Sequence, residues 1–123
     1  MTRGRKKGRT SRDTGALPAV RALRMKGLVE YARDAVVSRT IAKTRVGTMT
    51  LFAFDAGQEL SEHSAPYDAF VHVLDGEAAL TIGGKPVTAH AGELVVMPAD
   101  VPHAVKAHKR FKMLLTMLRA AKT

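Results

Sequence analysis

The sequence predicts an all-β domain, and three observations point to this fold class. From residue 36 onward, short runs rich in Val, Ile, Thr and Phe are separated by turn residues about every 8 to 12 positions. No segment of this part has the 3.6-residue periodicity of a long amphipathic helix. Roughly nine short strands in about 85 residues indicate a sandwich or a barrel.

The predicted elements follow one another closely along the chain. A segment that begins at Met25 predicts one short helical turn before the sheet. Strands are predicted over residues 36–44, 48–55, 60–63, 69–75, 77–82, 85–90, 94–97, 103–107 and 111–118. Gly83 and Gly84 can adopt the positive φ angles of a two-residue hairpin turn. Pro98 and Pro102 indicate a bend, because neither residue fits a central strand.

The first 24 residues differ from the rest of the chain in charge. Of the 20 basic residues, eight lie in residues 1–24, where Asp13 is the one acid. This segment has almost nothing to bury, so we predict a basic, disordered tail. Such a tail can bind nucleic acid only non-specifically, through its charge, and it has no aromatic side chain to stack on bases. The contrast in composition also leaves open a translation start at Met25.

The remaining composition limits the class of protein. The chain has 123 residues, which suffices for one domain, and we assign residues 25–123 to it. There is no cysteine, so neither a disulfide nor a thiolate zinc site holds the fold together. No apolar run approaches the ~20 residues of a membrane helix, and none after the basic start is long enough for a secretory signal. The sequence therefore predicts a cytoplasmic protein without a membrane partner.

Two segments, residues 57–76 and 92–107, carry a regular spacing of glycine, histidine and proline. The residues in these two frames are Gly57, His63 and Gly76, then Gly92, Pro98 and His103. In these positions the chain resembles the cupin superfamily. The phrases LFAFDAGQ, MPADVPHAV and FKMLLTM are also similar to those of small single-domain cupins, and the resemblance covers residues 36–118. It implies an RmlC-like jelly-roll barrel, also called a double-stranded β-helix.

The chain departs from the cupin pattern at about half of the metal-binding positions. The residues that replace motif residues are Ala65, Ala69, Asp100 and Ala107. In metal-binding cupins three imidazoles and one carboxylate converge inside the barrel, and only His63 and His103 remain at matching positions. The resemblance therefore implies a degenerate metal site. No cofactor is assured, and a divalent Fe, Mn, Zn or Ni ion bound by these two histidines is the alternative.

Strand geometry tests whether another side chain completes this site. Successive side chains alternate faces, so His72 has the opposite parity to His63, unless a bulge near Pro66 reverses the count. Facial iron sites use two histidines and one carboxylate, and catalytic zinc uses three protein ligands. Asp55 or Glu59 remains open as the source of the missing carboxylate.

The replaced residues favour one function over two others. Alanines in place of a histidine and a glutamate make the barrel interior larger and more apolar, as small-molecule sites usually are. We predict a small organic ligand in the barrel, bound in a pocket of His63, Ala65, Tyr67, Ala69, Val71 and His103. The alternative is a metal-dependent oxygenase or isomerase, so whether the protein is an enzyme stays open. Metal-free acid–base catalysis by one histidine ranks last, because no partner carboxylate lies at a fixed spacing.

The size of the domain predicts how it assembles. A folded part of about 90 residues has a high ratio of surface to core, and an open sandwich leaves edge strands that need cover. We therefore predict a homodimer joined through the sheets. The outward-facing residues Phe70, His72 and Leu74 are the expected contacts.

Overall fold

The computed structural model describes residues 17–120, and the predicted all-β fold is confirmed. One 3₁₀ turn, η1 (Met25–Gly27), is the helical segment of this range, so no described helix is long enough to cross a membrane. The strands are β1 (Val36–Lys43), β2 (Gly47–Phe54), β3 (Glu59–His63), β4 (Tyr67–Asp75), β5 (Glu77–Ile82), β6 (Lys85–His90), β7 (Leu94–Met97), β8 (His103–Lys106) and β9 (Phe111–Arg119). Of the predicted tail, residues 1–16 lie outside the described range.

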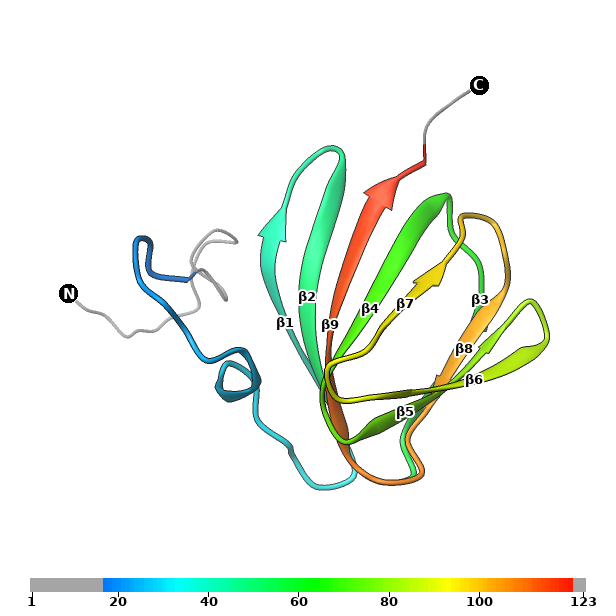
Figure 1. Ribbon diagram of the computed structural model, residues 1–123, viewed down its shortest axis with the longest axis horizontal. Coiled ribbons are helices and arrows are strands. Elements are labelled where there is room, and N and C mark those ends of the chain that lie inside the picture. The colour runs from blue at the N-terminus through cyan, green and yellow to red at the C-terminus, as the bar shows by residue number, and fades with distance from the viewer. Residues whose placement is uncertain (1–16, 121–123) are drawn as a thin grey trace.

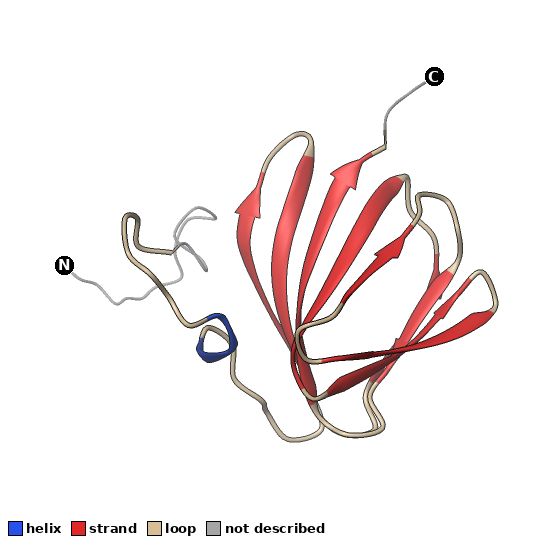
Figure 2. Cartoon of the chain, in the orientation of Figure 1, coloured by secondary structure: helices blue, strands red, loops and turns tan. Residues whose placement is uncertain are grey.

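The strands form two antiparallel sheets that pack face to face (Figures 1 and 2). One sheet has the order β1-β2-β9-β4-β7 and the other the order β3-β8-β5-β6. The last strand, β9, lies between β2 and β4, so the chain returns across the sheet as a jelly roll does. Figure 1 shows that the sheets meet at one end and fan apart toward the other. The fanned end, where β3 and β9 end and β4 and β8 begin, is called the mouth below.

The core lies between the sheets, and it is packed most tightly at the end opposite the mouth. Side chains alternate along each strand, so every second residue faces inward. At the closed end the rings of Phe54 and Phe111 stack with their centroids 4.6 Å apart. Val71, Val73 and Leu80 join the same cluster and are almost fully buried.

The outer face of the five-stranded sheet is partly covered by an N-terminal strap, defined as residues 25–31. Val29 is 4% exposed and packs in a second apolar cluster with Leu51 and Leu114 of the sheet. The Nζ atom of the buried Lys112 donates a hydrogen bond of 2.5 Å to the carbonyl of Lys26. These contacts tie the segment before β1 to the barrel.

Tyr31 ends the strap beside a charged cluster. Its hydroxyl donates a 2.6 Å hydrogen bond to Asp75, and the Arg110 guanidinium lies 4.4 Å from the ring centroid. Burial and the bond to Asp75 raise the pKa of Tyr31, because both favour the neutral phenol. This tyrosine is therefore a neutral anchor of the strap.

Candidate functional site

The two histidines singled out by the motif spacing are direct neighbours in the structure. His63 ends β3, His103 begins β8, and the two residues are paired across the strands. Their ring centroids lie 4.4 Å apart in an edge-to-face arrangement of 69°. Each of the two motif segments, residues 57–76 and 92–107, thus contributes one imidazole to the same place at the mouth.

A β-bulge in β3 produces this pairing. The register shifts between Leu60, which pairs with the buried Val105, and His63. The two positions differ by three in the sequence, an odd number, so strict alternation would place their side chains on opposite faces. The bulge adds one residue to β3 and returns His63 to the inward face. The sequence analysis left open a bulge near Pro66 and did not predict this one, because nothing at Ser61 or Glu62 signals it.

Both imidazoles are oriented by the backbone. The Nδ1 atom of His63 lies 2.9 Å from the carbonyl oxygen of Ser61, and Nδ1 of His103 lies 3.1 Å from that of Val101. A carbonyl oxygen can only accept, so each Nδ1 carries the proton. In the neutral rings the lone pair is therefore on Nε2, which leaves this atom able to accept a hydrogen bond.

Exposure increases along β9 toward the mouth. Phe111 and Met113 face inward and are 0% and 1% exposed, whereas the next inward residues, Leu115 and Met117, are only partly buried. The neighbouring strands β2 and β4 cover both flanks of β9, so solvent reaches these two side chains from the barrel interior. Phe52 on β2 and Ile82 on β5 show the same partial burial. The barrel is closed at one end and open at the mouth.

The predicted pocket residues fall into two groups. His63 is exposed at the mouth, and His103 beside it is 7% exposed. Ala69 and Val71 are 2% and 0% exposed and belong to the packed core. The backbone carbonyl of Ala65 accepts a hydrogen bond from Asp100, which fixes the rim loop between β7 and β8.

Tyr67 brings a cation to the mouth that the sequence analysis did not single out. The Arg119 guanidinium lies 5.3 Å from the ring centroid of Tyr67, and its Nη2 donates a 3.4 Å hydrogen bond to the phenol oxygen. Arg119 ends β9 and pairs with Tyr67, at the start of β4. A signal was present, because Arg119 continues the inward alternation of Phe111 and Met113 along the strand.

The donors that could complete a metal site are elsewhere. His72 is on the outer face of β4, as the parity of the strand predicts. Asp55 accepts hydrogen bonds from Asp34 and Arg110 at the closed end, and Glu59 lies beyond the bulge on the outer face. Within residues 17–120, no group of three or more His, Asp or Glu side chains is arranged to hold a metal ion. Two imidazoles alone do not fit a facial iron site or a catalytic zinc site, each of which needs a third protein ligand.

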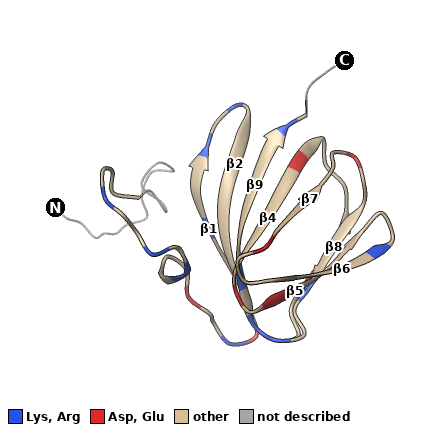
Figure 3. Ribbon diagram, viewed as in Figure 1, with Lys and Arg blue, Asp and Glu red and all other residues tan. Residues whose placement is uncertain are grey.

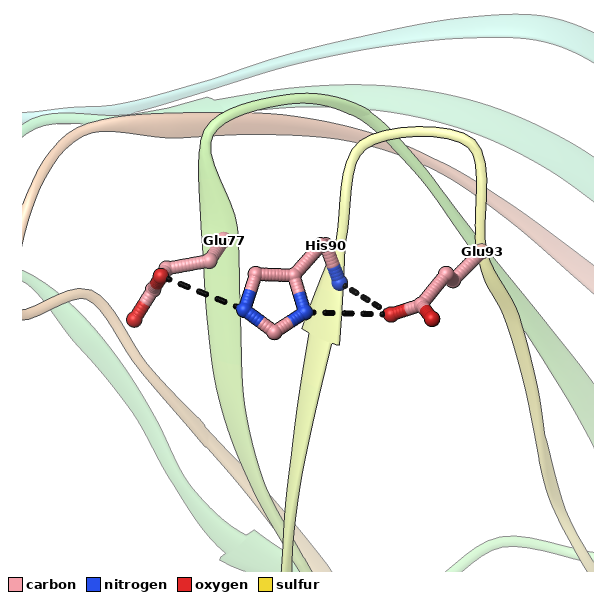
Figure 4. Close-up of polar contacts among 3 residues, drawn as sticks. All are labelled: Glu77, His90 and Glu93. Atoms are coloured by element: carbon pink, nitrogen blue, oxygen red, sulfur yellow. Dashed lines mark hydrogen bonds and ion pairs between the residues drawn. The ribbon is translucent and has the colours of Figure 1, made fainter.

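A second polar cluster, made of one histidine and two glutamates, lies away from the mouth (Figure 4). The Nδ1 atom of His90 is 3.2 Å from Glu93, and its Nε2 is 3.5 Å from Glu77. The backbone N–H of His90 also bonds Glu93, and this bond, followed by the imidazole contact, lowers the pKa of that carboxyl. The two carboxylates bind opposite sides of the ring, so they do not converge on one point. This cluster fixes the exposed turn between β6 and β7.

A shallow groove of about 280 Å³ lies on the outer face of the four-stranded sheet. It runs over β3, β8 and β5, on the side of the sheet away from the core. Its lining residues include Glu59, Ser61, Glu62, Ala79, Thr81 and Lys106. The groove is therefore distinct from the predicted pocket inside the barrel.

Comparisons with known proteins support this fold. A family model described as a cupin domain matches residues 50–117. A conserved protein of unknown function from Streptococcus pyogenes is 33% identical, covers 89% of this chain and 96% of its own, and has a TM-score of 0.83. A cupin superfamily protein from Desulfitobacterium hafniense is 29% identical over 87% of this chain and 98% of its own, with a TM-score of 0.81. No significant match was found among curated proteins. The chain belongs to the cupin family.

Proposed function

We propose that this cupin binds a small organic molecule at the mouth of its barrel. The observation that carries the proposal is the gradient of exposure along β9, from the buried Met113 to the partly exposed Leu115 and Met117. An inward-facing apolar side chain that solvent can reach is one that a ligand can cover. The gain is about 25 cal/mol for each Å² of apolar surface removed from water.

The polar groups at the mouth orient the bound molecule. His63 and His103 present Nε2 atoms whose tautomer is set by the backbone carbonyls behind them. Small-molecule sites combine a mostly apolar lining with a few such fixed polar groups. Ala65 and Ala69, which stand at two of the cupin metal-ligand positions, bring no charged side chain to this site.

A titration followed by methyl NMR tests this function. Protein labelled at the methionine methyl groups is titrated with three neutral probes, indole, benzamide and octanamide. We expect the Met117 methyl signal, which reports the mouth, to shift at saturation, and the Met49 signal on the outer face to stay unchanged.

Two variants locate the binding. Leu115→Trp fills the mouth and should abolish the shift of Met117. Leu118→Trp is the matched control, because Leu118 faces outward on the same strand and is 47% exposed. Equal binding by both variants, or shifts confined to Met49, would show that the mouth is not the site.

The second candidate is a metal-dependent enzyme that uses His63 and His103. One observation favours it, since a metal-ligating histidine usually donates its other ring N–H to a carbonyl or carboxylate, as both residues do here. The absent third protein ligand disfavours it. Metal content of tag-free protein, compared with the double variant His63→Ala, His103→Ala, separates the two candidates. Stoichiometric metal in the parent and none in the variant would favour the enzyme.

A further inference from the structure

We infer that the molecule bound at the mouth carries a carboxylate, which Arg119 and Tyr67 receive while the apolar part of the ligand lies against Leu115 and Met117. This inference rests on the proposed function and names the class of its ligand. Of its residues, Leu115, Met117 and Arg119 lie outside both motif segments, and Tyr67 lies within the first without being one of its motif positions.

The Arg119 guanidinium is held in position, and it has no ion-pair partner within residues 17–120. Its Nη2 is held by the Tyr67 hydroxyl at 3.4 Å, which restrains the side chain across the ring. Among residues 17–120, the ion pairs involve His90 and Arg110, and no carboxylate lies within 4.0 Å of Arg119. A guanidinium keeps its charge at any ordinary pH, and its planar fork matches a carboxylate in two parallel hydrogen bonds.

Arg119 lies near the histidine pair through the backbone. Its neighbour Ala120 donates an N–H to the carbonyl of Pro66, and Pro66 follows His63 by three residues. The end of β9 is thereby bonded to the segment that connects β3 and β4. The Arg119–Tyr67 pair and His63 are thus linked through the backbone at the mouth.

None of the acids near the mouth forms an ion pair with Arg119. Asp68 faces outward and accepts the backbone N–H of Ala99 at 2.9 Å. Glu62 lines the groove on the outer face of the other sheet. Asp100 lies in the exposed rim loop, where its own N–H bonds Ala65. Among residues 17–120, no carboxylate therefore lies within 4.0 Å of the Arg119 guanidinium to compete with a ligand.

The rim adds further positive charge. Figure 3 shows basic residues at the mouth ends of β1, β6 and β9 and in the turn between β1 and β2. These positions are Lys43, Lys85, Arg119 and Arg45. These four cations outnumber the three acids near the mouth, and an excess of one sign attracts ligands of the other sign and increases their local concentration. An organic acid suits both the charge of the rim and the apolar surface below it.

Paired probes that differ only in charge test the inference. Benzoate is compared with benzamide, and octanoate with octanamide, by the shift of the Met117 methyl signal in the full chain. We expect each carboxylate to bind at least about tenfold more tightly than its amide, since a hydrogen-bonded charge contributes more than a neutral pair. Arg119→Gln should reduce this ratio to near one by weakening the binding of the carboxylates, and Arg119→Lys should retain part of it.

Arg45→Gln is the matched control, because it removes a rim cation outside the contact with Tyr67 and should preserve most of the preference. Phenyl phosphate supplies the other common anion, and tighter binding of it than of benzoate would overturn the assignment of a carboxylate. Equal affinities for acids and amides in the parent, or a preference that survives in Arg119→Gln, would overturn the inference while leaving the binding function intact. Failure of every probe to shift Met117 would instead contradict the binding function itself.

Discussion

Gly76, between β4 and β5, shows how one residue sets a close backbone approach. Its φ is +72°, and a Cβ atom at this position would lie 2.5 Å from the carbonyl oxygen of Arg110. Gly92, a second motif glycine, has a φ of +90° and open space where a Cβ would be. The spacing of the motifs treats the two glycines alike, so their different environments could not be predicted from the sequence.

The two glycines form a matched pair for measurement. Gly92→Ala should lower the free energy of unfolding by the backbone term alone, about 1–2 kcal/mol. Gly76→Ala should lower it by more, because the Arg110 carbonyl must also move. Urea denaturation of both variants measures the difference. Equal losses of unfolding free energy would mean that the Arg110 carbonyl moves away from the added Cβ atom without a cost in stability.

Asp55 makes the stability of the fold depend on pH. Its Oδ2 accepts the N–H of Asp34 at 2.7 Å and its Oδ1 accepts Nη2 of Arg110 at 3.2 Å. The bond from Asp34, followed by that from Arg110, lowers the pKa of this carboxyl in the folded protein. A lowered pKa stabilises the fold above the ordinary value of 3.8, and this contribution is lost as the pH falls through the folded pKa.

The variant Asp55→Asn should therefore have a lower urea midpoint than the parent near pH 7. The difference in midpoint should close as the pH falls below the folded-state pKa of Asp55, which is lower than 3.8, because the parent carboxyl is then protonated too. Glu59→Gln, on the exposed edge strand, serves as the control for a simple loss of charge. If the difference in urea midpoint between the parent and Asp55→Asn were the same at neutral and at acidic pH, ionisation of Asp55 would be ruled out as its cause.

At the scale of elements, strand positions could be predicted and strand partners could not. Alternation and turn residues locate all nine strands to within two residues, because each run must bury one face. Placing β9 between β2 and β4 depends on contacts between distant segments, which no local pattern contains. The same limit applies to the site. His63 and His103 follow from the motif spacing, whereas the bulge that joins them and the exposure of Leu115 depend on the assembled sheets.

The strap is the element whose packing is easiest to test. Val29→Ala removes two methyl groups from a buried cluster and should lower the free energy of unfolding by about 2 kcal/mol. Val20→Ala is the same substitution at a position that is fully exposed, and it should cause no loss. Equal unfolding curves for the parent and Val29→Ala would mean that the strap contributes little to the fold.

At the scale of the whole molecule, the outer face of the five-stranded sheet remains partly apolar beyond the strap. Leu94, Val96 and Leu118 are 60%, 49% and 47% exposed, and Phe70 pairs with Val96 on the same face. Leu74, one of the expected dimer contacts, instead packs against the cluster of the strap. Contiguous exposed apolar residues of this kind mark interaction surfaces.

A second copy of the chain is the occupant that we predict for this face. A two-fold axis sets the same apolar surface against itself, so each chain covers Val96 and Leu94 of the other. Light scattering should then return about twice the chain mass of 13.3 kDa. Val96→Lys places a charge in the contact and should give a monomer, whereas Thr88→Lys, on the outer face of the other sheet, should leave the dimer intact. A parent of monomer mass at high concentration would contradict this assembly, and the apolar strip along β7 would then need another partner.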